Sequence, residues 1–192
     1  MVSLPIEDLN AGDLPLLEKL AVLTYQAGAT HAPSWLPTMD DAREEVDDAT
    51  EAGHVTRVLF DSDGSPLGWA STFHTYGDVW EIHPLVVDVR HHREGHGARI
   101  LADIEAVAAS RGAGVLIVGT SDETGGTSLG GRDLYADPIG AMASMTFDPS
   151  HAVGFWLRMG YALVGITPDA EGPGMPSINL AKRPAQPPTQ ER

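Results

Sequence analysis

The chain has 192 residues, with 27 acidic side chains against 12 lysines and arginines, which gives a formal net charge of −15 at pH 7. This charge disfavours nucleic acid and anionic membranes as partners and favours cationic ones. The absence of cysteine excludes a disulfide framework and thiol catalysis. The first residues, MVSLPIEDL, lack the basic and apolar regions of a signal peptide, and no apolar run approaches membrane-spanning length, so we expect a soluble cytoplasmic protein.

The length suits a single domain, which we place at residues 1–183, and the polar, proline-rich tail at 184–192 is expected to be disordered. Hydrophobic periodicity predicts the helices and strands. In chain order they are a strand near 2–7, a helix near 13–27, an acidic helix near 39–51, strands near 54–60, 67–76 and 79–89, a helix near 98–111, a strand near 115–120, a helix near 152–159, and strands near 161–167 and 177–181. The glycine-containing segment 121–150 is predicted to be irregular, and so long an insertion is either functional or mobile.

The acidic helix at 39–51 holds seven of the 27 acidic residues of the chain. Its apolar residues form a narrow stripe at helical spacing, so the acids must share the outer face; the stripe is Met39, Ala42, Val46 and Ala49. The acidic face is either an ordinary solvated surface or one wall of a site for a cationic acceptor. Both interpretations stay open at this point.

The strand at 79–89 carries a carboxylate, Glu81, shortly before a proline, Pro84. Proline donates no backbone hydrogen bond, so within a strand it marks an edge or a bulge. The apolar flanks favour a bulge, which frees neighbouring backbone groups from the ladder. Such groups beside a carboxylate can bind the amides of a ligand and polarise its carbonyl. The alternative is an edge proline next to a surface glutamate.

A glycine-rich turn at 90–97 leads directly into the amphipathic helix at 98–111. Backbone N–H groups at a helix start are unpaired and lie at the positive end of the helix dipole, so they bind phosphate readily. Glycines at 95 and 97 let the chain approach such a phosphate closely. The turn also carries histidines at 91, 92 and 96, which raise the alternative of a metal site. We favour no metal, because the glycines explain the segment without one.

The run HREGHG at 92–97 resembles the acetyl-CoA motif (Q/R)xxGx(G/A) of the GNAT superfamily of N-acetyltransferases, with histidine at the first position. Further pieces extend the resemblance over roughly residues 55–183, to aminoglycoside 6′-N-acetyltransferases with an EXHPL strand motif. These pieces are WEIHPL at 80–85, GTSDE at 119–123, DLY at 133–135, GY at 160–161, VG at 164–165, PDA at 168–170 and AKR at 181–183.

The resemblance implies an α/β (α+β) GNAT fold, with a mixed, mostly antiparallel, V-splayed sheet and helices on both faces. It implies direct transfer of acetyl from acetyl-CoA to a primary amine in a ternary complex. The acceptor it favours is the 6′-amine of an aminoglycoside, and a homodimer is common in the resembled enzymes. Two alternatives remain: an acceptor such as a polyamine or amino sugar, and a non-catalytic module that binds acyl-CoA or drug.

An ammonium cannot attack a thioester, so acetyl transfer needs a group that accepts a proton, and Glu81 is the candidate base. Glu81 as a mere anchor for a cationic substrate is the alternative. The backbone N–H of Leu85 is the candidate donor to the thioester oxygen, and His83 is a candidate partner of Glu81. The resemblance places acetyl-CoA against Leu85, Val86, Val87, His92, Arg93, Glu94, Gly95, His96, Gly97, Ala98, His151, Phe155 and Trp156.

The candidate contacts to the substrate, besides Glu81, are Trp35, Asp122, Glu123, Asp133 and Tyr135. For Asp122 and Asp133 the alternative is loop capping, which is a common role of aspartate.

Two departures from the resembled family bear on chemistry. Trp156 stands where family members have the tyrosine often assigned to protonate the CoA thiolate, and an indole N–H is a donor but no practical acid. The family's GxGKPDI near the end reads GPGMPSI at 172–178, without the lysine and the aspartate. The fold is unaffected by these changes, whereas the rate and the substrate identity depend on them.

Overall fold

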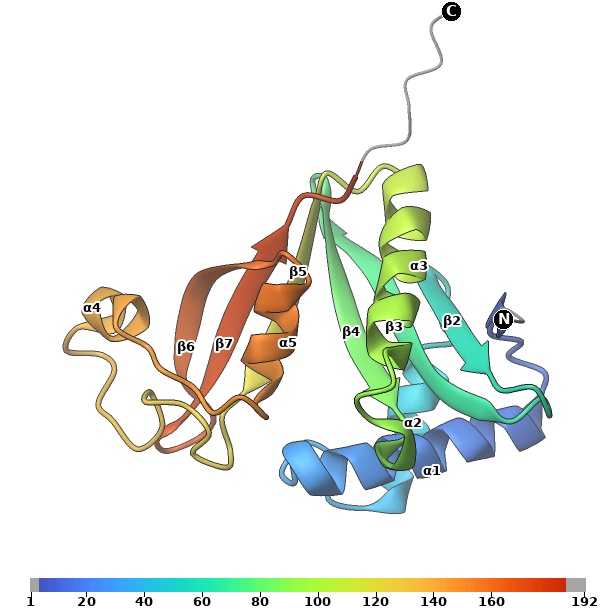
Figure 1. Ribbon diagram of the computed structural model, residues 1–192, viewed down its shortest axis with the longest axis horizontal. Helices are drawn as coiled ribbons and strands as arrows, with labels where there is room; N and C mark the ends of the chain where they lie inside the picture. Colours follow the sequence, from blue (N-terminus) through green and yellow to red (C-terminus); the bar gives the residue numbers. More distant parts are fainter. Residues whose placement is uncertain (1–3, 186–192) are drawn as a thin grey trace, which may run out of the picture.

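The computed structural model describes residues 4–185, and one seven-stranded sheet runs through them in the order β1-β2-β3-β4-β5-β7-β6 (Figure 1). The strands are β1 (Ile6–Asp8), β2 (His54–Phe60), β3 (Pro66–Tyr76), β4 (Val79–Val87), β5 (Val115–Ser121), β6 (Ala162–Gly172) and β7 (Met175–Lys182). The helices are α1 (Leu14–His31), α2 (Met39–Asp48), the 3-10 turn η1 (Val89–His91), α3 (His96–Ser110), α4 (Pro138–Ala143) and α5 (Ala152–Arg158).

The sheet is mixed and splayed, as predicted. Every strand pair is antiparallel except β4 and β5. These two strands pair over only three positions, where Val79–Glu81 lies beside Val115–Ile117. Beyond Glu81 they diverge, and Figure 1 shows the sheet opening into two arms at this point.

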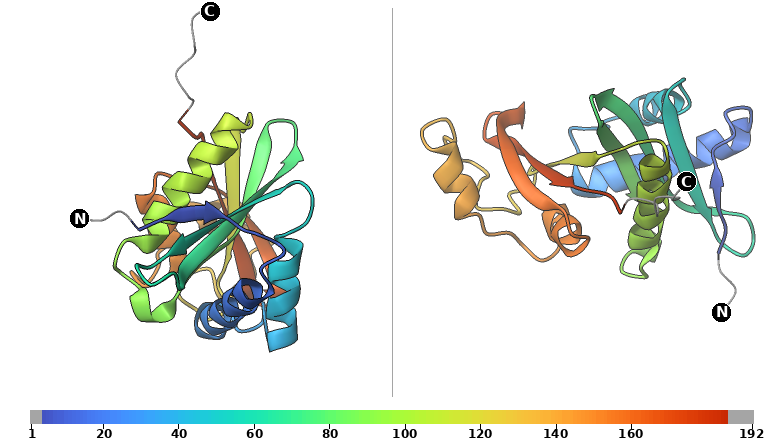
Figure 2. Two further views of the ribbon diagram at one scale, coloured as in Figure 1. Left: turned by 90° about the vertical axis from the view of Figure 1, so that its right-hand side faces the viewer. Right: turned by 90° about the horizontal axis from the view of Figure 1, so that it is seen from above.

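Helices cover both faces of the sheet, which confirms the predicted layering (Figure 2). On one face, α3 and α5 pack against the strands in a cluster that includes the fully buried Ile100 and Ile104. On the other face, α1 and α2 share a second cluster around Trp69, whose indole nitrogen donates to Thr24 Oγ1 at 3.0 Å. The two cores hold the β1–β4 arm rigid from both sides, so β4 is a firm support for the residues it carries.

The structure corrects several predicted boundaries. Helix α1 runs to His31, one turn beyond the predicted end, and the absent side chain of Gly28 lets Leu36 pack against that last turn. Strand β6 extends to Gly172 as one half of a hairpin with β7. The first strand begins at Ile6 rather than near residue 2, and residues 1–3 lie outside the described part of the chain. The predicted disordered tail also lies largely outside it, from residue 186 onward.

The segment 121–150 is less irregular than predicted, because it contains the short helix α4. This helix has a proline in its first turn, and the Asp137 carboxylate accepts a hydrogen bond from the Gly140 N–H at 2.9 Å. A single β-bridge joins Thr127 to Phe147 and closes the segment into a compact loop. No helix within residues 4–185 is both long enough and apolar enough to cross a membrane.

Candidate active site

Strand β4 carries the predicted bulge. Along β3, Ala70 pairs with Leu85 and Thr72 pairs with Ile82, so the two residues His83 and Pro84 lie opposite a single residue of β3. The bulge comes directly after the last pair between β4 and β5. The ladder is therefore interrupted on both sides of β4 at the same place, and backbone groups there are released from the sheet.

A cavity of about 780 Å³ occupies the opening between the two arms. Glu81, His83 and Leu85 line it from β4, and Val118 and Ser121 line it from β5. The end of α1, the start of α5 and the strands β6 and β7 complete the wall. The volume is that of a typical small-molecule site, and the bulge lies at its floor.

His83 is held from two directions at the cavity wall. Its Nε2 lies 3.3 Å from Oε1 of Glu45 on α2, and its ring packs edge-on against Trp35 with centroids 5.5 Å apart. Partial burial works against a charge on His83, but the hydrogen bond to Glu45 and the negative charges of Glu45, Glu81 and Glu171 outweigh it, so the pKa of His83 is raised. His83 therefore carries positive charge more readily than a free histidine, and it is fixed in place.

A contact joins the two arms across the open end of the V. The Glu123 carboxylate, which follows β5, accepts a hydrogen bond from the Ser34 N–H at 2.7 Å and one from Ser121 Oγ at 3.3 Å. Ser34 belongs to the connection between α1 and α2, and Trp35 beside it lines the cavity. Glu123 thus fixes the connection that carries Trp35, in addition to lining the cavity itself.

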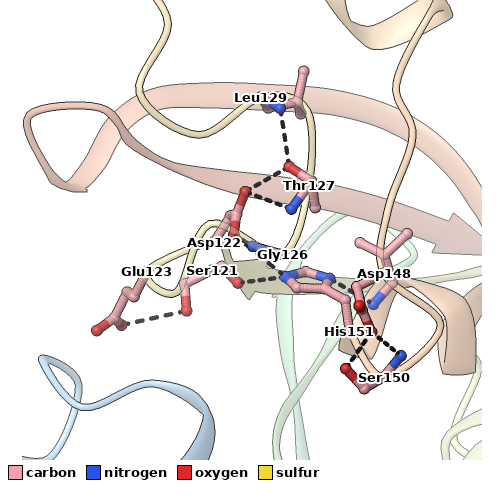
Figure 3. Close-up of polar contacts among 10 residues, drawn as sticks. Ser121, Asp122, Glu123, Gly126, Thr127, Leu129, Asp148, Ser150 and His151 are labelled. Atoms are coloured by element: carbon pink, nitrogen blue, oxygen red, sulfur yellow. Dashed lines mark hydrogen bonds and ion pairs between the residues drawn. The ribbon is translucent and has the colours of Figure 1, made fainter.

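Asp122 has a different environment from Glu123, although the two are adjacent (Figure 3). The residue is 1% exposed, and its carboxylate accepts hydrogen bonds from Gly126 N at 2.7 Å, Thr127 N at 3.1 Å and Thr127 Oγ1 at 2.5 Å. The carboxylate is saturated by the loop that follows it, and it does not line the cavity. This is the loop-capping alternative that the sequence left open.

His151 anchors the start of α5 to the same loop (Figure 3). Its Nδ1 accepts the Val153 N–H at 3.2 Å, so the ring proton is on Nε2, which donates to the carbonyl of Ser121 at 3.1 Å. A Cβ on Gly126 would come within 2.7 Å of this ring, so only glycine fits there. Both ring nitrogens are thereby used in positioning α5.

Helix α5 connects the cavity to the loop before α3. Trp156 is 5% exposed, lines the cavity, and packs edge-on against Phe155 and Tyr161. A Cβ added at Gly97 would lie 3.6 Å from both the Phe155 ring and the Val87 side chain. The first turn of α3, the end of β4 and α5 therefore meet at one point beside the cavity.

The start of α3 is open. Gly95 occupies the N-cap position with φ at 87°, in the left-handed region that favours glycine, and no side chain caps the helix. Asp88 stabilises the turn before it by accepting from the Arg90 N–H at 2.9 Å, and the Arg90 guanidinium lowers the pKa of Asp88. The amides of the first turn are therefore not used by a side-chain cap, and such a helix start favours an anion.

The cavity lining is predominantly acidic. Within the described residues, the lining contains four carboxylates and no lysine or arginine; the carboxylates are Glu81, Glu123, Asp148 and Glu171. Histidines at 31, 83 and 151 are its other ionisable groups of note. Clefts lined by one sign of charge raise the local concentration of oppositely charged ligands, so this cavity favours a cation.

The predicted site residues fall into three groups. Those that line the cavity are Trp35, Glu81, His83, Leu85, Val86, Glu123, His151 and Trp156. Those that lie beside it, at the end of β4, the start of α3 and in α5, are Val87, His92, Arg93, Glu94, Gly95, His96, Gly97, Ala98 and Phe155. Asp122, Asp133 and Tyr135 lie off the cavity, and the Asp133 carboxylate accepts the Tyr135 N–H at 3.1 Å.

The acidic face of α2 is not a wall of this cavity, since no α2 residue lines it. The most direct connection of α2 to the site is the contact between Glu45 and His83. The other acids lie on the surface around the buried stripe, which the structure confirms for Ala42, Val46 and Ala49. The solvated-face interpretation is therefore the correct one for most of this helix.

Sequence reasoning missed His31, Asp148 and Glu171, which all line the cavity. His31 was placed beyond the end of α1, yet its ring stacks on His92 with centroids 5.5 Å apart. Glu171 lies in the part of β6 that was predicted to be loop. Correct element boundaries would have placed His31 and Glu171 at helix and strand ends near the opening, where binding residues concentrate.

The chain is similar to a known protein family and to several solved structures. The model of the acetyltransferase (GNAT) family matches residues 16–129. No curated protein sequence matches the chain. A crystal structure of an aminoglycoside 6′-N-acetyltransferase complexed with coenzyme A is 28% identical with a TM-score of 0.85, over 96% of this chain and 99% of that one.

A second crystal structure, of the aminoglycoside 6′-N-acetyltransferase from Enterococcus faecium, is also 28% identical, with a TM-score of 0.81 and the same coverage of both chains. The ribosomal-protein-S18-alanine N-acetyltransferase from Escherichia coli, at 14% identity and a TM-score of 0.64 over 99% of each chain, shares the fold alone.

Proposed function

Because the chain belongs to the GNAT family of acetyltransferases, we propose that it acetylates a primary amine of a polycationic small molecule, namely the 6′-amine of an aminoglycoside. The observation that carries the proposal is the cavity lining of four carboxylates without lysine or arginine among the described residues. The two similar structures at 28% identity are both aminoglycoside 6′-N-acetyltransferases, which supports the same acceptor. An antibiotic-resistance role follows if the acceptor is correct.

Acetyl-CoA is the acetyl donor of this family, and one of the similar structures holds coenzyme A. The uncapped start of α3 fits its diphosphate, because unpaired amides and the helix dipole favour an anion. The ring of Phe155 and the side chain of Val87 flank the first turn of α3. They lead from the phosphate site to Trp156 and the bulge, where the thioester would lie.

Glu81 is the group we assign to the attacking amine. It lies immediately before the splay and lines the cavity from β4. The ammonium first loses a proton to Glu81, directly or through one water, so that the neutral amine can attack. The nitrogen then bonds to the acetyl carbon as the carbon–sulfur bond breaks, and it gives its second proton to water. An anchoring role for Glu81, without proton transfer, is the alternative within the same proposal.

The backbone around the bulge supplies the hydrogen-bond donor for the thioester oxygen. Leu85 follows the bulge and lines the cavity, and we assign its N–H to the thioester oxygen, where a fixed donor stabilises developing negative charge. Trp156 occupies the position of the family's tyrosine but offers no transferable proton. In this proposal water protonates the thiolate, and the acyl transfer proceeds by direct attack without a covalent enzyme intermediate.

A homodimer stays a prediction from the family resemblance. Large apolar side chains are exposed in the segment between β5 and β7, namely Tyr135, Ile139, Phe147 and Val164. A subunit contact would bury such side chains, and light scattering on the purified protein measures the mass of the assembly.

The experiment that tests the proposal is thiol release from acetyl-CoA with a matched pair of aminoglycosides, one with a 6′-amine and one with a 6′-hydroxyl, such as tobramycin and paromomycin. Turnover with the 6′-amine alone is the expected result. Turnover with both drugs moves the reaction to another amine. If neither drug is acetylated by a protein that binds acetyl-CoA, the aminoglycoside is not the acceptor. Turnover on a polyamine or amino sugar would then support an acetyltransferase with that acceptor. No turnover with any amine supports a non-catalytic binding module.

A further inference from the structure

The loop between β4 and α3 gathers three side chains that the proposed acetyl transfer does not need. Nδ1 of His91 and Nε2 of His96 each lie 3.2 Å from the same atom, Oε2 of Glu94. The three ligand atoms lie within 4.8 Å of one another, and this is the one such group found among residues 4–185. In the proposed function the diphosphate is held by backbone amides of this loop, which leaves these three side chains for another ligand.

The backbone explains why these three residues converge. His91 ends η1 and His96 begins α3, so both are fixed by hydrogen-bonded turns. On the two sides of Glu94, Arg93 and Gly95 adopt left-handed conformations with φ at 67° and 87°. The chain therefore curls around Glu94 and presents it between the two histidines.

Sequence reasoning weighed His92 with His91 and His96 and favoured no metal. The structure removes His92 from this set, because its Nε2 is bonded to the carbonyl oxygen of Val87 at 3.0 Å. Glu94 takes its place. The glycines of the loop explain its backbone course, but they do not explain why two histidines meet on one carboxylate oxygen.

Two of the three spacings match the ligands of one small ion. Zinc binds imidazole nitrogen and carboxylate oxygen at about 2.0–2.2 Å in tetrahedral geometry. The ligand atoms of such a tetrahedron are separated by about 1.6 bond lengths, or roughly 3.3 Å. Both contacts to Glu94 measure 3.2 Å. The remaining spacing, between the two histidine nitrogens, is within 4.8 Å, so one ion can reach all three ligand atoms with little side-chain movement.

We propose that His91, Glu94 and His96 bind one Zn²⁺ ion. Two histidines and a carboxylate form a common donor set for zinc, and they leave a fourth position open to water. The site is accessible, since the side chains of His91 and Glu94 are 40% and 52% exposed, while that of His96 is 13% exposed and firmly held. Mg²⁺ and Ca²⁺, which prefer oxygen ligands, are not expected to compete.

This zinc site is separate from the acetyl-transfer chemistry, which needs no metal. It lies on the loop before α3, whereas Glu81 and the bulge lie within β4. The metal-binding assay contains no acetyl-CoA and no amine. Its result is therefore independent of whether the proposed acetyltransferase function holds.

The test is calorimetric titration of the untagged, chelator-treated protein with Zn²⁺ at neutral pH, together with the visible spectrum of the Co²⁺ form. We expect one high-affinity site per chain, and a Co²⁺ spectrum typical of four-coordinate geometry. The variants His91→Gln, Glu94→Gln and His96→Gln are each expected to weaken binding by about tenfold or more, because each removes one of three ligands. Circular dichroism and thermal melting establish that every variant is folded.

His74→Gln is the matched control. His74 is exposed on the β3–β4 hairpin, where its Nε2 contacts the Gly77 carbonyl at 2.8 Å, and it is expected to leave the affinity for Zn²⁺ unchanged. The proposal is overturned if the wild-type protein takes up no Zn²⁺. It is equally overturned if the three ligand variants, correctly folded, bind as tightly as the wild type.

Discussion

The donor side and the acceptor side of the site are built in different ways. The proposed donor side is mainly one continuous stretch, from the end of β4 through η1 to the first turn of α3, to which α5 adds Phe155 and Trp156. The acceptor cavity draws its lining from α1, β4, β5, β6, β7 and α5, together with the loop after β5. A site made of one stretch is a property of local backbone geometry. A site gathered from many elements depends on every boundary and packing contact between them.

This difference explains what the sequence could predict. The bulge at Pro84 and the open helix start at Gly95 follow from the backbone preferences of proline and glycine, which act on the nearest neighbours. Both predictions are confirmed. The splayed sheet and the layering of helices followed from the family resemblance, and the structure confirms them as well.

The acceptor side was predictable only in part, because its residues are far apart in the chain. Glu123 was found through a short motif, but its bond to the Ser34 N–H bridges 89 positions and leaves no local signal. The adjacent Asp122 belongs to the same short motif, yet its carboxylate is occupied by hydrogen bonds from its own loop. Two neighbouring acids with similar sequence context therefore differ in role because the loop beyond them folds back on only one.

Glu81 is the acceptor-side residue with the largest expected effect. Glu81→Gln keeps the shape but removes the proton acceptor, so we expect kcat to fall by about 100- to 10,000-fold. Acetyl-CoA affinity should stay unchanged, because the donor side is intact. Thiol-release kinetics and calorimetry of acetyl-CoA measure the two quantities. An unchanged kcat would leave Glu81 with an anchoring role only.

Gly95 tests the donor side in the same way. Gly95→Val forces a β-branched side chain into the left-handed region and is expected to distort the loop, raising KM for acetyl-CoA by about tenfold. Gly64→Val is the matched control, since Gly64 has φ at 77° in the β2–β3 turn, far from the loop in sequence. Similar KM values in both variants would show that the donor side does not depend on this turn.

Asp122 and Asp133 separate loop support from substrate contact. Asp122→Ala leaves three donors, two of them buried, without their acceptor and should cost about 3 kcal/mol of unfolding free energy, or roughly 10 °C in Tm. Asp133→Ala should shift Tm little, because Asp133 is exposed and bonds only one N–H in its own turn. Calorimetric melting of both variants measures this. Equal Tm values would contradict the capping role of Asp122.

A variant at Glu171 measures how much the negative charge of the acceptor cavity contributes to substrate binding. Glu171→Gln removes one of the four carboxylates of the lining and is expected to raise KM for a polycationic amine a few-fold, an effect that shrinks as salt increases. Glu44→Gln removes the same charge from the exposed face of α2 and should leave KM nearly unchanged. If both variants raise KM equally, net charge rather than the cavity attracts the substrate.

The pair of Glu45 and His83 gives the smallest effect, and it depends on pH. The pKa of His83 is raised in the folded protein, so its contact with Glu45 stabilises the fold when His83 is protonated. This stabilisation is fully present below about pH 6.5, the pKa of an unfolded histidine, and is lost as the pH rises through the raised pKa. The stability of Glu45→Gln should therefore fall below that of the wild type near pH 5.5 and approach it at about pH 8. Urea unfolding at both pH values measures the difference. A gap that widens toward high pH would contradict this assignment.

The most direct test of the account is the position of the new acetyl group in the product formed from a 6′-amino aminoglycoside and acetyl-CoA. Two-dimensional NMR of the purified product identifies the modified nitrogen. We predict acetylation at the 6′-nitrogen, with the amine placed beside Glu81 at the bulge of β4. Acetylation at another nitrogen, or no product from an enzyme that binds acetyl-CoA, would contradict it.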